Sequence, residues 1–271
     1  MRGASLASLS VARERLEPIL ASAGAGSQVV GDELFTVVDA LDGSGPLRRA
    51  LADPSRPAAD KAGLVRSLLS DSFDPRTVDL LSGVVQSRWS SERDLVDAVD
   101  HLAIDAYLAS AQARGALETV EDELFQITRG LVGQREVRRA LSDSSTDPAR
   151  RIALVEQLLV GKVDDVTLAV CRRATVKPRG ERFVPALVRV GDIAAARRNK
   201  VVAAVTVGAP LTTEQEDRLG RLLAESYGTE IQLNVTVDAS VIGGLRVLVG
   251  SDVLDSTVLA RLADARRQLA G

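Results

Sequence analysis

Few side chains in this sequence have the types and spacing that catalysis or metal binding requires. His101 is the only histidine and Cys171 the only cysteine, so neither a histidine-based metal site nor a catalytic triad is available. Asp252 and Asp255 are two carboxylates without further ligands, which is weak evidence for a metal ion. We interpret them as fixing a turn and the start of the last helix. We therefore expect no catalytic residue, no cofactor and no metal.

The adjacent glycines Gly243 and Gly244 are the other candidate for a binding site. A phosphate loop would need Gly-x-x-x-x-Gly-Lys-Ser/Thr, or glycines that open a helix directly after a strand, and neither pattern occurs. Glycine supplies the positive φ of a tight connection, so we interpret the pair as a turn. We expect His101 on a helix face or at an interface, Cys171 in an apolar core, and Trp89 as a core or inter-helix anchor.

Composition excludes several classes of protein. The 271 residues are 45% hydrophobic and 26% charged, with a net charge of −3, whereas a nucleic-acid binder would carry a basic excess. No apolar stretch approaches the roughly 18–20 residues that span a bilayer. A single cysteine excludes an internal disulfide and is typical of a reducing cytoplasm. The expectation is a protein that faces the cytoplasm and has no membrane span.

An internal repeat dominates the first two thirds of the chain. Residues 30–69 align without gaps with residues 120–159, at an offset of 90, and about 18 of the 40 positions are identical. Chance would give only a few identities, so this is a duplication. Each copy has the i, i+3, i+4, i+7 spacing of an apolar helical face, as at Leu34, Val37, Val38 and Leu41. The repeat predicts two similar helical bundles that share a long helix near 94–113.

The last third has a different pattern. Residues 201–207 are a β-branched run that predicts a strand, and Thr213 with Glu216 matches a capping box at the start of a helix. Alternating apolar residues from Ile231 to Val237 predict a second strand, residues 245–249 a third, and residues 257–269 a final helix. The fold class is therefore mainly α, with two tandem helical bundles followed by a small β-α-β-β-α module.

The C-terminal third contains Val237-Asp238, Ile242-Gly243-Gly244-Leu245, Val249-Gly250-Ser251-Asp252 and Asp255-Ser256, and this set of motifs resembles a known family. The pattern in the C-terminal third is similar to the signature of the delta subunits of bacterial F-type ATP synthases, whose mitochondrial homologue is the oligomycin-sensitivity-conferring protein. The resemblance covers residues 107–271 directly, and the repeat extends it toward the N-terminus. The matching signature positions are Asp238, Ile242, Gly243, Gly244, Leu245, Gly250, Asp252, Asp255 and Ser256.

The resemblance implies a mechanical function without an active site. A subunit of this family joins the catalytic head to the peripheral stalk, so that proton-driven rotation yields ATP synthesis. Its helical bundle would accept the N-terminal helix of an alpha subunit, and its C-terminal domain would bind the C-terminal region of the b (or b′) subunit. The expected location is the cytoplasmic side of the cell membrane, as a peripheral protein without nucleic-acid partners.

One departure from the family is the second bundle, a feature similar to the long delta subunits of actinobacteria. We expect an extra N-terminal bundle at residues 1–106, the family-type bundle at 107–199 and the stalk-binding domain at 200–271. Our hypothesis is that the extra bundle braces a longer contact with the stalk, so that deleting residues 1–105 would weaken stalk binding.

Two questions stay open from the sequence. The segment from 170 to 200 carries nine Lys or Arg residues against two acids, and it is either a solvated helix face or the docking site of an acidic partner helix. Two other functions would fit part of the chain. An unrelated helical-repeat adaptor would explain the duplication but not the C-terminal signature. A nucleotide-handling enzyme would explain an α/β domain, but the sequence lacks the necessary phosphate, base and nucleophile residues.

Overall fold

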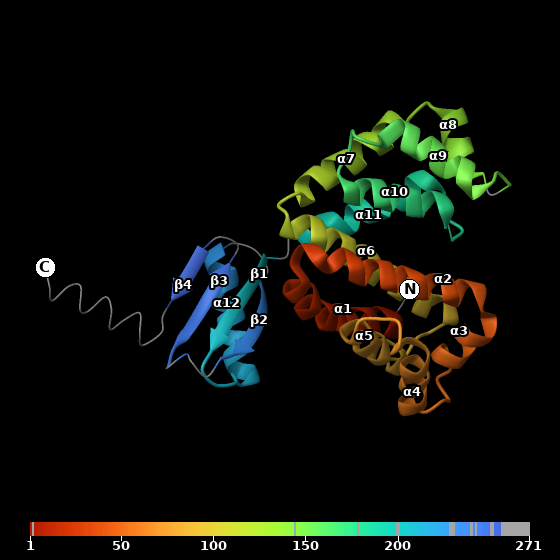
Figure 1. Cartoon of the computed structure of the whole chain (residues 1–271). Coiled ribbons are helices and arrows are strands. Elements are labelled where there is room, and N and C mark those ends of the chain that lie inside the picture. The colour runs from red at the N-terminus through yellow and green to blue at the C-terminus, as the bar shows by residue number, and fades with distance from the viewer. Residues whose placement is uncertain are drawn as a thin grey trace, which may run out of the picture. The chain divides into compact units, whose positions relative to one another are not determined.

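The computed structural model describes residues 1, 3–143, 145–177, 179–198, 201–227, 231–238, 241, 243–249 and 252–255. The chain divides into two compact units, Met1–Ala195 and Ala196–Gly271 (Figure 1). The first unit is helical and the second is a small α/β sheet module. This agrees with the predicted fold class.

The helical unit contains one succession of helices for each copy of the repeat. The first copy comprises α1 (Ala4–Ala23), the 3-10 turn η1 (Gly24–Gly26), α2 (Ser27–Gly43), α3 (Gly45–Ala52), α4 (Ala58–Leu69), α5 (Pro75–Gln86) and α6 (Glu92–Ala113). The second continues with α7 (Leu117–Gly130), α8 (Arg135–Ser142), α9 (Pro148–Leu159), α10 (Asp165–Val176) and α11 (Phe183–Arg198). Helices α3, α4 and α5 recur as α8, α9 and α10 at the offset of 90 found in the sequence.

Local hydrogen bonds recur at the same offset. Asp74 caps α5 by accepting from the Arg76 amide, and Asp164 caps α10 by accepting from the Val166 amide. The amides of these two aspartates donate in turn to the carboxylates of their own copies, Glu33 at 2.8 Å and Glu123 at 3.0 Å. Glu33 lies on α2 and Glu123 on α7. The first bond therefore joins α2 to the start of α5, and the second joins α7 to the start of α10. The duplication is therefore structural as well as sequential.

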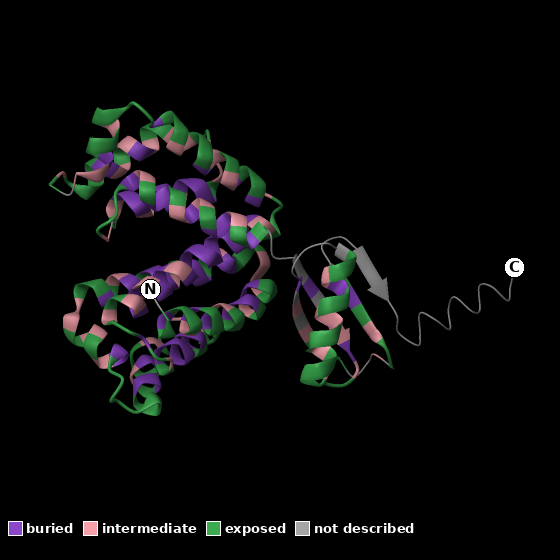
Figure 2. Ribbon diagram, turned by 180° about the vertical axis from the view of Figure 1, so that it is seen from behind, coloured by how far each residue is buried: buried purple, intermediate pink, exposed green. Residues whose placement is uncertain are grey.

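Helix α6 belongs to both copies, as the sequence predicted. It packs against α1, α2 and α3 of the first copy and against α7 and α10 of the second. Every residue from Leu102 to Ala111 lies in the interior. Figure 2 shows this helix as an almost continuous buried stretch between the two copies. One hydrophobic core accordingly runs through the whole helical unit.

The C-terminal unit is a mixed sheet covered by a helix. Its elements are β1 (Val201–Val207), α12 (Thr213–Tyr227), β2 (Ile231–Val237), β3 (Leu245–Val249) and β4 (Asp252–Asp255). The strand order is β2-β1-β3-β4, with β1 parallel to β2 and antiparallel to β3. Apolar side chains from β1, β2, β3 and α12 form its own core.

The sequence analysis missed one strand. β4 pairs antiparallel with β3 at residues that we had assigned to a turn and the start of a helix. A four-residue strand is too short to show an alternating pattern, and its polar ends give no apolar face. The final helix predicted at 257–269 lies outside the described residues.

Candidate functional site

The glycine pair of the C-terminal signature forms a turn. Gly243 and Gly244 have φ values of 68° and 82°, a region in which side chains other than glycine are strained. The Gly243 amide donates to the Val241 carbonyl at 3.1 Å, and Leu245 then begins β3. This confirms the turn interpretation.

The same loop is fastened to the end of β1. The Asp238 amide donates to the Val207 carbonyl at 2.8 Å, and the Val241 amide donates to the Asp238 carbonyl at 3.0 Å. A Cβ on Gly208 would collide with the Val241 carbonyl oxygen, so this residue must be glycine for the loop to lie against β1. The signature residues before β3 thus build a close connection from β2 across β1 to β3.

The other signature positions are only partly placed. Asp252 and Asp255 are the first and last residues of β4, where their partners on β3 are Val249 and Arg246. The predicted positions Ile242, Gly250 and Ser256 lie outside the described residues.

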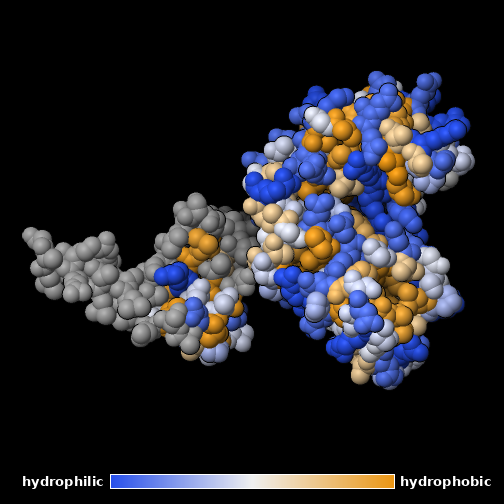
Figure 3. Space-filling view, viewed as in Figure 1, coloured by the Kyte–Doolittle hydropathy of each residue, from blue (hydrophilic) through white to orange (hydrophobic). Residues whose placement is uncertain are grey.

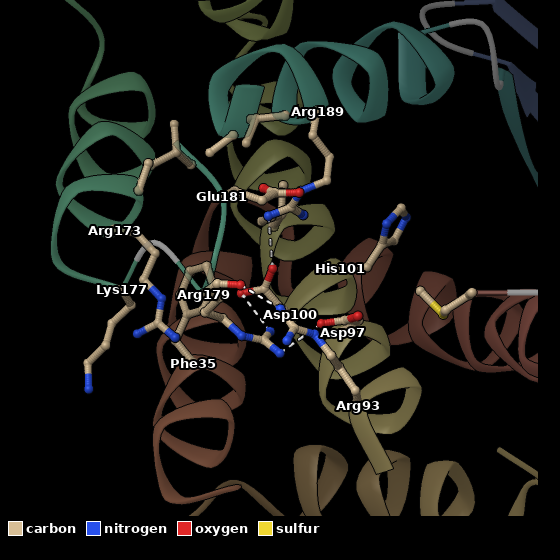
Figure 4. Close-up of a pocket in the computed structure, with 16 residues that line it drawn as sticks. Phe35, Arg93, Asp97, Asp100, His101, Arg173, Lys177, Arg179, Glu181 and Arg189 are labelled. Carbon is tan, nitrogen blue, oxygen red and sulfur yellow. Dashed lines mark hydrogen bonds and ion pairs between the residues drawn. The ribbon is translucent and has the colours of Figure 1, made fainter. Parts of the chain in front are cut away.

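A charged cavity of the helical unit lies where the two copies meet. It has a volume of about 250 Å³ and is lined by residues of α6, α10 and α11 and of the connection between α10 and α11, together with Met1 and Phe35. Figure 4 shows Arg179 and Arg189 directed at the carboxylates of α6. We call this group the inter-copy ion cluster and define it as Asp39, Asp42, Asp97, Asp100, Arg173, Lys177, Arg179, Glu181 and Arg189.

Arg179 is the centre of the inter-copy ion cluster. Its guanidinium lies 3.0 Å from Asp42, 2.8 Å from Asp97 and 3.6 Å from Asp100. Its carbonyl accepts a hydrogen bond from Arg93 at 2.7 Å. It is also the only non-glycine residue with positive φ among those described, at 48°. That backbone conformation costs about 1–2 kcal/mol, so the surrounding contacts must hold it in place.

Further pairs join the same elements. Arg189 lies 3.2 Å from both Asp100 and Glu181, and Arg173 lies 2.9 Å from Asp39. The Arg173 guanidinium also lies over the ring of Phe35, 4.4 Å from its centroid. Burial raises the pKa of Asp97, and the charge of Arg179 opposes that rise. The cluster therefore connects the two copies through partly buried ion pairs. Those of Arg179 with Asp97, and of Arg189 with Asp100 and Glu181, are also charge-assisted hydrogen bonds.

The inter-copy ion cluster answers part of the question about the basic segment. Arg173, Lys177, Arg179 and Arg189 all pair with carboxylates of the chain itself, on α2, on α6 and at Glu181. Apart from Glu181, the carboxylates that pair with these basic residues lie on α2 of the first copy and on the shared helix α6. Sequence reasoning missed this because it searched for the partner outside the chain. The abundance of aspartate on α2 and α6 was the available signal.

The three single residues singled out from the sequence have structural environments. Cys171 is fully buried, and burial raises the pKa of its thiol to about 12, so it stays a core thiol. Trp89 is buried and donates its indole N–H to the Val84 carbonyl at 2.9 Å, which confirms the anchor interpretation. His101 lines the cavity between the copies, with Nε2 4.0 Å from the Asp105 carboxylate. Burial lowers the pKa of His101, which favours the neutral ring.

The described part of the chain offers neither a metal site nor a membrane span. No group of three or more His, Cys, Asp or Glu side chains is close enough there to hold a metal ion. Among the same residues, no helix combines the length and the apolar character needed to cross a membrane.

Comparison with known proteins decides the family. The profile of the family described as "ATP synthase delta (OSCP) subunit" matches residues 105–269. A protein of Beutenbergia cavernae named "ATP synthase subunit delta" is 50% identical, and the match spans 100% of both chains. Proteins with the same name from Kineococcus radiotolerans and Streptomyces griseus are each 40% identical, over at least 98% of either chain. The chain belongs to the ATP synthase delta (OSCP) subunit family.

The limits of the family match agree with the architecture. The profile begins at residue 105, inside the shared helix α6, and so covers the end of that helix, the rest of the second copy and most of the C-terminal unit. The relatives from the three organisms align over the first copy as well. A chain from the "Cryo-EM structure of Toxoplasma gondii mitochondrial ATP synthase hexamer, composite model" is 22% identical and covers 62% of this chain and 97% of its own, with a TM-score of 0.28. A TM-score that low carries no argument about the fold. The family profile and the full-length relatives confirm the family resemblance seen in the sequence. They exclude the alternative of an unrelated helical-repeat adaptor.

Proposed function

We propose that this chain is a non-catalytic stator subunit of the F-type proton-translocating ATP synthase. It links the catalytic head of alpha and beta subunits to the b stalk, and it acts as a peripheral protein on the cytoplasmic side of the cell membrane. Membership of the delta (OSCP) family is the observation that carries this proposal. The subunit makes and breaks no bond, so its task is to hold its partners against the torque of the rotor.

We assign one partner to each part of the chain. The family-type bundle at 107–199 binds the N-terminal helix of the alpha subunit, the module at 200–271 binds the C-terminal region of b or b′, and residues 1–106 form the extra bundle. An amphipathic helix binds through apolar anchors at i, i+3, i+4 and i+7, which need apolar side chains on the receiving surface.

The second copy exposes such side chains. Phe125 is 62% exposed, whereas its counterpart in the first copy, Phe35, is 8% exposed and packs its ring against Tyr107. Val132 is 74% exposed just after α7. Figure 3 shows apolar side chains at the surface of the helical unit among hydrophilic ones. A large aromatic residue released from the core in only one copy supports a docking role for that copy.

Calorimetric titration with a peptide of the cognate alpha subunit's N-terminus tests this assignment. We expect one-to-one, submicromolar binding that weakens about tenfold or more in Phe125→Ser, because an interface anchor contributes about 1–2 kcal/mol or more. Leu68→Ser is the control, since Leu68 is similarly exposed, at 54%, but lies in the first copy. Absence of binding by a folded protein would contradict the alpha assignment, and equal weakening by both variants would place the groove elsewhere.

A further inference from the structure

One end of the second copy carries four arginines whose only acidic partner there, among the described residues, is Asp143, whose pKa the charge of Arg139 helps to lower. Arg135, Arg138 and Arg139 on α8 line a cleft of about 830 Å³ together with Arg182, which directly precedes α11. We call this the arginine cleft and define it by these four residues. All four are exposed, and none of their guanidinium groups makes a hydrogen bond or ion pair with a described residue.

Helical geometry gathers three of these charges on one face. Arg135, Arg138 and Arg139 occupy positions i, i+3 and i+4 of α8, and Ser142 at i+7 completes the same stripe. Glu136, the one acid on this helix, is three residues from Arg139 and borders this stripe, so one acid faces the charge of three arginines. Three like charges on one face repel each other, which destabilises the isolated helix. An arrangement of this kind gains stability when an anion binds.

The acids nearest to the cleft are already engaged. Glu181 pairs with Arg189 at 3.2 Å, in the inter-copy ion cluster. Asp143 accepts hydrogen bonds from the amide and the hydroxyl of Ser145, at 2.9 Å and 2.6 Å, which close its own turn. Asp143 also lines the cleft, and the charge of Arg139 helps to lower its pKa, so the four arginines face one engaged carboxylate and the cleft keeps a positive charge.

The first copy shows what a satisfied version of this site looks like. Arg48 and Arg49 are the counterparts of Arg138 and Arg139, and Arg48 lies 3.7 Å from Glu92 at the start of α6. Arg48 also donates to the carbonyls of Leu41 and Asp42, at 2.6 Å and 3.0 Å. The arginine of the first copy is therefore supplied with acceptors by its own fold.

The second copy replaces that acid by a base. The counterpart of Glu92 is Arg182, the counterpart of Asp94 is Val184, and the counterpart of Gly45 is Arg135. Each replacement makes the site more positive. Two neighbouring replacements act in the opposite direction, since Pro46 corresponds to Glu136 and Arg93 to Phe183. The site as a whole is nevertheless more positive in the second copy and keeps the Arg-Arg pair, as recognition of an external anion would require.

We propose that the arginine cleft is a docking site for an acidic, glutamate-rich segment of a partner protein. Each guanidinium presents a fork of donors that matches a carboxylate in bidentate geometry. Val184 and Pro185 form an apolar wall beside the arginines, so the segment places an apolar side chain next to its acids. The net charge of −3 on the whole chain disfavours a nucleic-acid partner. This proposal does not rest on the assignment of the alpha and b contacts, because it follows from the cleft alone.

Fluorescence anisotropy with a short labelled peptide of glutamate and leucine tests the proposal on the full-length protein. The control peptide has glutamine in place of every glutamate. We expect binding of the acidic peptide alone, weakening as salt rises, because the contacts are charged and exposed. Equal binding of the glutamine peptide would overturn the proposal.

Three substitutions locate the site. Arg182→Glu supplies the acid that Glu92 provides in the first copy, so it should weaken peptide binding about tenfold or more without lowering the thermal midpoint. Arg139→Gln should also weaken binding, whereas Arg49→Gln, the same change at the equivalent exposed position of the first copy, should not. Unchanged binding in Arg182→Glu and Arg139→Gln would overturn the proposal. Tighter, arginine-dependent binding of single-stranded DNA, of anionic phospholipid vesicles or of inorganic phosphate would do the same.

Discussion

At the scale of single residues, Gly31 shows how little space separates α2 from α6. A Cβ at this position would lie 2.5 Å from Cδ2 of Tyr107 and 3.2 Å from the Ala103 carbonyl oxygen. Tyr107 has no freedom to move aside, because its hydroxyl donates to the Asp32 carboxylate and its ring packs against Phe35 with centroids 5.6 Å apart. Gly31 is therefore a packing requirement, and the second copy has Glu121 there instead.

Gly31→Ala should consequently lower the free energy of unfolding by about 1–3 kcal/mol, the usual result of overpacking a close contact. Gly63→Ala is the matched control. Gly63 is exposed inside α4 with nothing within 4 Å of a Cβ, so alanine there should stabilise the protein by about 0.5–1 kcal/mol. Thermal unfolding followed by circular dichroism measures both. A neutral Gly31→Ala would mean that α2 and α6 are less tightly packed than the structure shows.

At the scale of elements, the inter-copy ion cluster holds α10 and α11 to α2 and α6. Arg179→Ala removes the cation from three carboxylates, of which Asp100 is buried and would lose one of its two arginine partners. We expect the free energy of unfolding to fall by about 3 kcal/mol. This is the lower end of the range for a broken buried ion pair, because Asp42 and Asp97 keep access to water. Amide hydrogen exchange should then rise in α10 and α11.

Arg172→Ala is the control for that variant. Arg172 pairs with Glu156 at 2.7 Å inside the second copy, and both side chains are more than a third exposed. An exposed pair of this kind contributes about 0–1 kcal/mol. If Arg179→Ala were as mild as Arg172→Ala, the cluster would not be what joins the copies.

The sequence was sufficient to predict some elements and insufficient for others, for physical reasons. The apolar spacing at Leu34, Val38 and Leu41 is local, and so is the alternation from Ile231 to Val237, so those elements were predicted. The inter-copy ion cluster depends on contacts between residues far apart in the sequence, such as Arg179 and Asp97, which local periodicity does not contain. The turn at Gly243 and Gly244 was predicted because only glycine adopts that backbone conformation readily.

At the scale of the whole molecule, the shared helix limits what a deletion can show. A chain that begins after residue 105 would lack most of α6, and residues 95–104 of that helix include buried side chains that pack in the common core. Loss of binding in such a truncation would then report unfolding of the second copy. The proposed brace of the first bundle against the stalk needs a test that leaves α6 intact.

Leu68 and Leu158 provide that test, because they are equivalent positions, on α4 and α9, and are 54% and 40% exposed. If the first bundle braces the stalk, Leu68→Glu should weaken binding of a peptide from the C-terminal region of b by about tenfold, the effect of losing about 1.4 kcal/mol of apolar contact. Leu158→Glu should leave that affinity unchanged, since it makes the same substitution, a leucine replaced by a charged residue, at the equivalent position of the second copy. Both variants should retain the wild-type thermal midpoint, because neither side chain is buried. Surface plasmon resonance measures the affinities, and equal affinities in the two variants and the wild type would remove α4 of the first copy from the stalk contact.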